Sequence, residues 1–263
     1  MTEELSPGKH LIERFGSFSH LDHPGEYEAC LLINRALDED FDEDSVDAGI
    51  RLLVNTCDKP QAPWTYLRAL GFSGDQTGNR FLDNSRLDKV LERKRGIPIT
   101  LAILLVHVAR QFGHSAWGIN FPGHFLARVN DQLIDPFNME VVSEAACLSR
   151  LSEKSAGNPF ETADGQAVLL RMLNNLKYGF ALSRTWERAL DMVDYQLAVL
   201  PDTPALLIER GDFWARLGAI AAARQSYQQA LEIAGSQLPG GAVHASLAQA
   251  RLNGITGASE TLH

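Results

Sequence analysis

The sequence has few cysteines, no long hydrophobic run and no excess of basic charge. Its 263 residues contain only three widely spaced cysteines, with no Cys-x-x-Cys pair: Cys30, Cys57 and Cys147. A sparse, odd set of this kind indicates reduced thiols and a cytoplasmic protein rather than a disulfide framework. The longest apolar run, within residues 99–108, is too short to span a bilayer. The first residues show no basic region followed by an apolar one, so we expect neither a secretory signal nor a membrane partner.

Basic residues are outnumbered, with 24 Lys and Arg against 33 Asp and Glu, which gives a formal net charge of −9. This balance argues against a broad phosphate-binding surface, so no nucleic-acid partner is expected. A transcriptional regulator that acts on DNA is a weak alternative, because the chain also has no helix-turn-helix pattern. The short basic run at residues 93–95 fits a solvated helix end.

Seven acidic residues within residues 38–47 raise the question of a calcium site. An EF-hand loop needs glycine at its sixth position and glutamate at its twelfth, and neither possible start of the loop supplies them. The run therefore predicts an exposed loop leading into a helix capped near Ser45. His107 has no second ligand at metal-site spacing, which favours a core histidine. We expect no metal and no cofactor.

The first half of the chain predicts helices followed by a short sheet, an α+β and mostly helical class. Residues 1–23 are polar with little periodicity and predict a loose start, whereas the glycines of residues 71–79 predict a loop. A helix capped by Asn84 or Ser85, with Asp88 completing a capping box, should follow that loop. Apolar residues at helical spacing predict earlier helices over residues 26–37, 46–56 and 63–70.

Residues 97–112 are apolar on nearly every side, which is typical of a buried helix. Pro98 suits the first turn of that helix because its missing N–H costs nothing there, and Gly113 is a natural stop. Residues 114–120 and 125–129 have strand character, and a turn at residues 130–131 predicts a hairpin.

The second half of the chain predicts only helices, arranged as a repeat. A period of 34 residues with small residues and aromatics at fixed places is typical of tetratricopeptide repeats. We expect a first domain over residues 1–160 and a repeat domain over residues 161–263, with repeats at about 170–203 and 204–237 and a capping helix at 243–252. The matched pairs are Leu173 with Leu207, Phe180 with Trp214, Ala189 with Ala223, Val193 with Tyr227, and Leu197 with Leu231.

Three motifs carry a family resemblance. They are Leu82-Asp-Asn-Ser-Arg-Leu-Asp-Lys-Val-Leu-Glu-Arg-Lys-Arg-Gly-Ile-Pro-Ile-Thr-Leu, Gly118-Ile-Asn-Phe-Pro-Gly-His-Phe-Leu and Ile134-Asp-Pro-Phe-Asn. Together they resemble the SirB-type bacterial proteins, which join a transglutaminase-like domain of papain-like fold to tetratricopeptide repeats. The resemblance covers roughly residues 25 to 255. Met139-Glu140 stands where that family tends to have a glycine pair.

The resemblance implies a catalytic triad that has lost its nucleophile. In transglutaminase-like enzymes a thiolate at the start of a buried helix attacks the substrate, a histidine acts as base and an aspartate orients the ring. Laid on this sequence, the pattern puts the histidine at His124, the aspartate at Asp135 and the nucleophile at Pro98, which has none. Thr100, two residues further along the helix, is a weak substitute, and nothing in the sequence directs the three cysteines to His124.

These residues favour a non-catalytic binding or scaffold protein, with a regulatory role, whose repeats hold a protein or peptide. The alternative is a hydrolase or acyltransferase that uses His124 and Asp135 with an unrecognised nucleophile. Around the pair, the aromatic residues 117, 121, 125 and 137 suggest either a ligand cleft or core. The residues expected to contact a ligand are Trp117, Asn120, Phe125 and Asn138.

Overall fold

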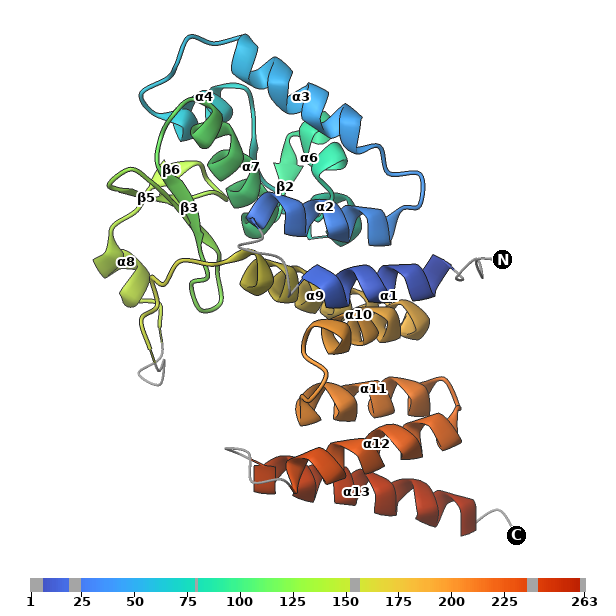
Figure 1. Cartoon of the computed structure of the whole chain (residues 1–263). Coiled ribbons are helices and arrows are strands. Elements are labelled where there is room, and N and C mark those ends of the chain that lie inside the picture. Colours follow the sequence, from blue (N-terminus) through green and yellow to red (C-terminus); the bar gives the residue numbers. More distant parts are fainter. Residues whose placement is uncertain (1–6, 19–24, 79, 152–156, 236–240, 261–263) are drawn as a thin grey trace. The chain divides into compact units, whose positions relative to one another are not determined.

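The computed structural model describes residues 7–18, 25–78, 80–151, 157–235 and 241–260 (Figure 1). The chain forms two compact units. The first, which we call the sheet unit, consists of residues 21–172. The second, which we call the helical unit, joins residues 1–20 to residues 173–263.

The sheet unit combines seven helices with six short strands in its described part. Its helices are α2 (Glu26–Leu37), α3 (Glu43–Asn55), α4 (Pro63–Ala69), α5 (Phe81–Asn84), α6 (Leu87–Arg93), α7 (Pro98–Gln111) and α8 (Glu144–Leu148). Its strands are β1 (Ser73–Gly74), β2 (Arg95–Gly96), β3 (Ala116–Ile119), β4 (Leu126–Val129), β5 (Gln132–Asp135) and β6 (Glu140–Val141).

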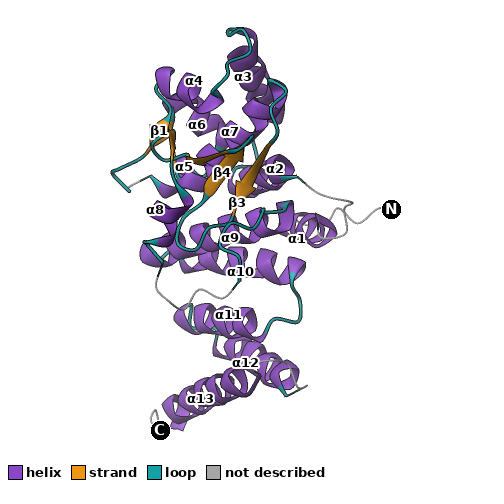
Figure 2. Ribbon diagram, turned by 90° about the vertical axis from the view of Figure 1, so that its left-hand side faces the viewer, coloured by secondary structure: helices purple, strands orange, loops and turns teal. Residues whose placement is uncertain are grey.

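Helix α7 is the centre of the sheet unit, as its sequence predicts. Ile97 is its N-cap residue and Pro98 opens its first turn, while ten of its side chains are buried. The helix packs on β3 and β4 of a four-stranded antiparallel sheet with the order β3-β4-β5-β6 (Figure 2). Asn130, with φ of 50°, forms the tight turn between β4 and β5, so the predicted hairpin is confirmed. The strand β6 was not predicted.

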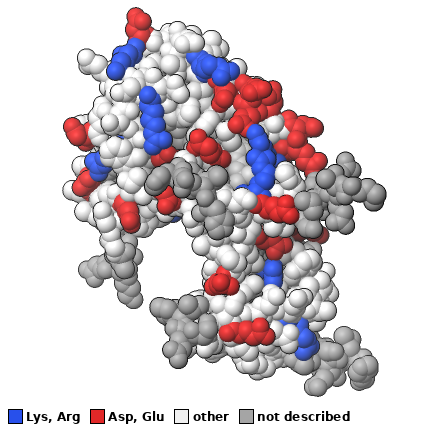
Figure 3. Space-filling view, in the orientation of Figure 1, with Lys and Arg blue, Asp and Glu red and all other residues white. Residues whose placement is uncertain are grey.

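Two of the predicted helix starts were wrong. The carboxylate of Asp42, not Ser45, caps α3 by accepting the N–H of Ser45 at 3.2 Å. The acidic residues before it gather on the surface over the connection between α2 and α3 (Figure 3).

The second wrong start is that of α6. No capping box forms at Ser85, because the fully buried side chain of Asn34 in α2 caps this helix from a distance. Its Oδ1 accepts the N–H of Leu87 at 2.7 Å, and its Nδ2 donates to the carbonyl of Ser85 at 3.1 Å. Asp88 instead pairs with Arg86 at 2.7 Å.

The segment predicted as a loop at residues 71–79 contains a strand. β1 pairs in parallel with β2, directly before α7. Gly74 is required there, because a Cβ on this residue would lie 2.1 Å from the ring of Phe137. The N–H of Gly74 also donates to the carbonyl of Phe137 at 2.6 Å. This pair therefore ties the segment after β5 to the entry of α7.

The helical unit consists of helices in its described part. They are α1 (Pro7–Phe18), α9 (Gly165–Leu182, which begins in the sheet unit), α10 (Trp186–Val199), α11 (Pro204–Arg216), α12 (Ile220–Ala234) and α13 (Gly241–Glu260). α13 is longer than the capping helix expected at residues 243–252. Short loops join α10 to α11 and α11 to α12 (Figure 1). Gly211 lets α11 approach α12, since a Cβ on it would lie 2.3 Å from the ring of Tyr227.

The expectation of a loose start was wrong for residues 7–18. They form α1, which packs along α10 within the helical unit. The ring of Phe15 is fully buried and stacks on Tyr195 with the ring centroids 4.3 Å apart. The local sequence did not predict this helix, because the ring that covers Phe15 belongs to Tyr195, far along the chain. Across the described ranges, no helix has the length and apolar character to cross a bilayer.

Candidate functional site

His124 and Asp135 form a hydrogen-bonded pair in the sheet unit. His124 lies in the turn before β4 and Asp135 ends β5, so antiparallel pairing brings them together as their spacing predicts. The ring Nε2 lies 2.9 Å from Asp135 Oδ1. Because an ionised carboxylate only accepts hydrogen bonds, Nε2 carries the proton in the neutral ring. Nδ1 is then left with a free lone pair.

Asp135 is held as a carboxylate. Burial by itself would raise its pKa, since the side chain is 8% exposed. The hydrogen bond and charge of His124, together with the N–H of Phe137 at 2.9 Å, outweigh burial and lower the pKa below its ordinary value. Asp135 therefore fixes the orientation of the ring and stabilises any positive charge on it.

A cavity of about 260 Å³ lies in front of this pair. One side of it is apolar and the other carries four polar side chains. The lining residues are Phe121, Pro122, Gly123, His124, Leu126, Asp135, Val142, Cys147 and Arg150.

Cys147 shares this cavity with the pair, a contact that no pattern in the sequence predicted. It lies on α8, a five-residue helix whose N-cap Ser143 accepts the N–H of Ala146 at 3.2 Å. The thiol is buried, with 4% exposure, in a small apolar cluster. Burial raises its pKa, and the nearby charge of Arg150 opposes this only in part. Cys147 is therefore a protonated thiol at neutral pH.

Arg150 adds a cation to the same cavity. It follows α8, and its residue surface is exposed. Across the described part of the chain, its guanidinium forms no hydrogen bond or ion pair. Its charge nevertheless lowers the pKa of both Asp135 and Cys147, so it lies near both groups.

Pro98 and Thr100 lie outside the lining of this cavity. Pro98 occupies the first turn of α7 and offers no nucleophile. Thr100 is fully buried, and its hydroxyl is a buried polar atom without a hydrogen-bond partner among the described residues. A substrate in the cavity would therefore meet neither residue.

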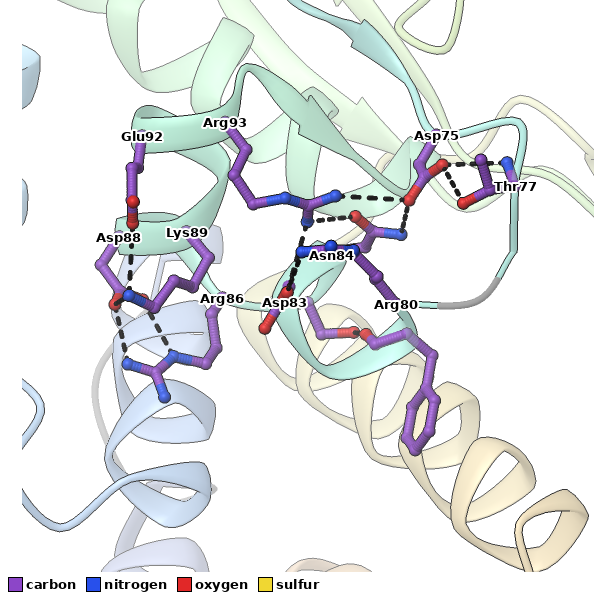
Figure 4. Close-up of polar contacts among 12 residues, drawn as sticks. Asp75, Thr77, Arg80, Asp83, Asn84, Arg86, Asp88, Lys89, Glu92 and Arg93 are labelled. Atoms are coloured by element: carbon purple, nitrogen blue, oxygen red, sulfur yellow. Dashed lines mark hydrogen bonds and ion pairs between the residues drawn. The ribbon is translucent and has the colours of Figure 1, made fainter.

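A polar network holds the chain at the entry of α7 (Figure 4). The carboxylate of Asp75 accepts hydrogen bonds from the Thr77 hydroxyl at 2.7 Å and from Asn84 Nδ2 at 2.8 Å. Arg93 donates to Asn84 Oδ1 at 3.0 Å and lies 3.5 Å from Asp75. These bonds hold the pKa of Asp75 far below its ordinary value. The network ties β1, α5 and α6 together beside β2, and so fixes where α7 begins.

The four residues expected to contact a ligand do not line the cavity. Phe125 is 2% exposed and packs against Gly118, where a Cβ would lie 2.9 Å from its ring. Trp117 packs on the apolar cluster around Cys147, and Asn120 accepts a hydrogen bond from Arg171 at 3.1 Å. Asn138 is exposed on the surface.

Among the described residues, the other ionisable side chains do not assemble a metal centre. In the ranges that the structure describes, no group of three or more His, Cys, Asp or Glu side chains has suitable geometry. His107 is half-buried and stacks on Tyr27 with the ring centroids 3.9 Å apart. Burial lowers the pKa of His107, which keeps the ring neutral.

The buried helix, the two-stranded ladder at its start and the sheet that carries the His–Asp pair form one continuous stretch of the chain. The model of the transglutaminase-like superfamily matches residues 51–174. The chain is also homologous to bacterial UPF0162 and SirB1 proteins. It is 32% identical over 178 residues to a UPF0162 protein of Xylella fastidiosa, covering 62% of this chain and 63% of that protein.

Two further relatives extend this homology. A UPF0162 protein of Vibrio cholerae is 30% identical over 173 residues, or 62% of this chain and 64% of that protein. Protein SirB1 of Salmonella typhimurium is 26% identical over 159 residues, or 56% of this chain and 59% of that protein. The chain thus spans less than two thirds of the length of each of these relatives. No solved structure matches.

Proposed function

We propose that this chain is a non-catalytic binding protein whose helical unit holds a protein or peptide partner. The observation that carries the proposal is Pro98 in the first turn of α7, where the family resemblance expects a nucleophile and proline offers none. In this proposal the His124–Asp135 pair shapes a pocket and does not turn over a substrate. The 34-residue period supports tetratricopeptide repeats, which commonly hold extended chains on their inner surface.

A groove of about 610 Å³ in the helical unit offers a place for such a partner. It combines aliphatic side chains with three carboxylates and one guanidinium. The lining residues are Ile12, Asp194, Leu197, Ala198, Pro201, Asp202, Leu207, Arg210, Gln229, Glu232 and Ile233.

The charges of the groove favour a basic peptide. Arg210 is occupied by hydrogen bonds to Ser226 at 3.1 Å and Gln229 at 2.5 Å. Asp202 and Glu232 are exposed, and no described residue forms an ion pair with either. Lysine side chains suit this surface, because their aliphatic stems cover apolar groups while the ammonium reaches a carboxylate.

Fluorescence polarisation with short labelled peptides tests the proposal. Peptides matched in apolar content should bind when they carry lysine and not when they carry glutamate. The double variant Asp202→Asn/Glu232→Gln should weaken binding by about tenfold, equivalent to about 1.4 kcal/mol. Glu187→Gln, an exposed carboxylate of α10 outside the groove, is the matched control. Equal binding of both peptide classes, or equal loss in the control, would contradict the proposal.

A second candidate function follows from Cys147. A thiol in the same cavity as His124 and Asp135 supports a hydrolase or acyltransferase in which Nδ1 of His124 takes the thiol proton. The raised pKa of Cys147 argues against it. Labelling with iodoacetamide separates the two functions. A binding protein should show slow labelling of Cys147 that His124→Ala leaves unchanged, whereas rapid, His124-dependent labelling would establish the second function.

A further inference from the structure

We infer that the cavity in front of His124 is a binding site for a carboxylate group. This inference concerns the sheet unit alone and does not depend on the partner proposed for the helical unit. It rests on three features of the lining: a guanidinium without a partner, a histidine that can become a second donor, and an apolar wall of limited size.

The guanidinium of Arg150 supplies the charge. In the described ranges it is the cation of this cavity, and no described carboxylate forms an ion pair with it. A guanidinium presents paired N–H donors whose geometry matches the two oxygens of a carboxylate. Binding a carboxylate there would satisfy Arg150 without displacing any existing hydrogen bond.

His124 supplies a second donor when it takes up a proton. Its Nε2–H is already bound to Asp135 at 2.9 Å, so the extra proton goes to Nδ1. The groups that face the ring across this cavity are Asp135 on β5, Cys147 on α8 and Arg150 after α8. A bound carboxylate would accept a hydrogen bond from Nδ1–H, so binding should be coupled to uptake of a proton by His124.

The size and charge of the cavity limit the kind of ligand that it can bind. A volume of about 260 Å³ holds one short acidic chain or one peptide terminus. Phe121, Leu126 and Val142 form an apolar wall suited to a few methylene groups. With one cation, Arg150, and the buried anion Asp135 in the lining, a singly charged carboxylate fits better than a doubly charged phosphate. The carboxylate can belong to a small organic acid or to the C-terminus of a peptide.

Isothermal titration calorimetry of the full chain tests this inference with two matched pairs of probes. The first pair is the α-amide of N-acetylglutamate, which has one carboxylate, and N-acetylglutamine amide, and the second is a short peptide with a free C-terminus and the same peptide C-amidated. We expect the carboxylate member of at least one pair to bind at least tenfold more tightly than its neutral twin. The pair that responds identifies the source of the carboxylate. Titration in buffers of different ionisation enthalpy should show uptake of a proton that His124→Asn removes.

Arg150→Gln should weaken carboxylate binding by tenfold or more, while Arg150→Lys should retain part of it. Arg51→Gln, which removes an exposed cation of α3 outside the cavity, should leave binding unchanged. Circular dichroism of each variant reports on folding, and an exposed residue such as Arg150 should tolerate replacement. Equal binding of the neutral probes, tighter binding of inorganic phosphate, equal loss in Arg51→Gln, or no binding of any carboxylate at millimolar concentration would overturn the inference.

Discussion

Each unit of the molecule places an aspartate beside a cavity, and the two aspartates are held in opposite ways. Asp135 in the sheet unit receives hydrogen bonds from His124 and from a backbone N–H, and its pKa is lowered. Asp194 in the helical unit has Arg210 at 3.8 Å as its nearest cation, and burial raises its pKa to about 6. Asp135 thus accepts two hydrogen bonds within the fold, whereas Asp194 has a longer ion pair.

The contrast shows two ways of building a binding surface. In the sheet unit, buried side chains bond backbone groups and fix a small cavity in advance. In the helical unit, helix packing forms the groove and leaves the carboxylate of Asp194 with Arg210, at 3.8 Å, as its nearest cation. A ligand of the sheet unit must therefore fit hydrogen-bonding groups that are already in place. A cationic ligand of the helical unit would instead give Asp194 a closer partner.

The largest expected effect that separates the units is that of Asn34→Ala. This change leaves the N–H of Leu87 and the carbonyl of Ser85 unpaired in the core of the sheet unit. We expect a loss of about 3 kcal/mol in the free energy of unfolding of that unit. Peptide-resolved hydrogen exchange should show faster exchange over α2 and α6, with the helical unit unchanged.

The matched change in the helical unit is Gln196→Ala. Its side chain is also buried and accepts a hydrogen bond from Lys177 at 3.0 Å, but Lys177 keeps its ion pair with Glu209. This variant should lose only about 1 kcal/mol because no backbone group is orphaned. Equal losses in the two variants would show that the units do not differ in this respect.

The two aspartates predict opposite pH dependence of stability. The folded pKa of Asp194 lies above its ordinary value of 3.8, so the helical unit should lose stability as the pH rises from about 4 to about 6. The folded pKa of Asp135 lies below 3.8, so the sheet unit should lose stability as the pH falls below about 4.

Urea unfolding followed by hydrogen exchange across this pH range measures both slopes. Asp194→Asn should flatten the slope of the helical unit and stabilise it by about 1 kcal/mol at neutral pH, a value reduced for its partial exposure. Asp135→Asn should reduce the loss of stability that the sheet unit shows at acid pH. If the stability of the helical unit still falls with rising pH in Asp194→Asn, another group is responsible for the pH dependence.

The smallest expected effect comes from Thr100→Val in α7. Replacing the buried hydroxyl by a methyl group of the same shape removes an unsatisfied polar atom. We expect a gain of about 1 kcal/mol in the stability of the sheet unit. Differential scanning calorimetry should show a higher Tm, while a lower Tm would indicate that the hydroxyl has a partner in solution.

The parts of the fold that the sequence predicted depend on neighbours in the chain. Helix α7 follows from its apolar run and Pro98, and the β4–β5 hairpin follows from alternation and its turn residues. The parts that failed depend on distant partners. Helix α1 needs Tyr195 to cover Phe15, and α6 takes its cap from Asn34. A local pattern carries no information about such contacts.

The same distinction applies to the candidate site. The spacing of His124 and Asp135 predicted their contact, because a hairpin sets it. Cys147 and Arg150 reach the cavity through the course of the chain after β6, and the local sequence around them carries no record of that course. Of the aromatic residues near His124, Phe121 lines the cavity, whereas Phe125 belongs to the core, as its packing against Gly118 shows.

The packing of α1 on α10 also has a consequence for the order of events during synthesis. Phe15 leaves the ribosome 180 residues before Tyr195, the ring on which it stacks. At about 5–20 residues per second, this interval lasts roughly 9–36 seconds. The residues of the sheet unit emerge during that wait. The first helix of the chain is therefore among the last to find its place, and until then its apolar face is open to chaperones.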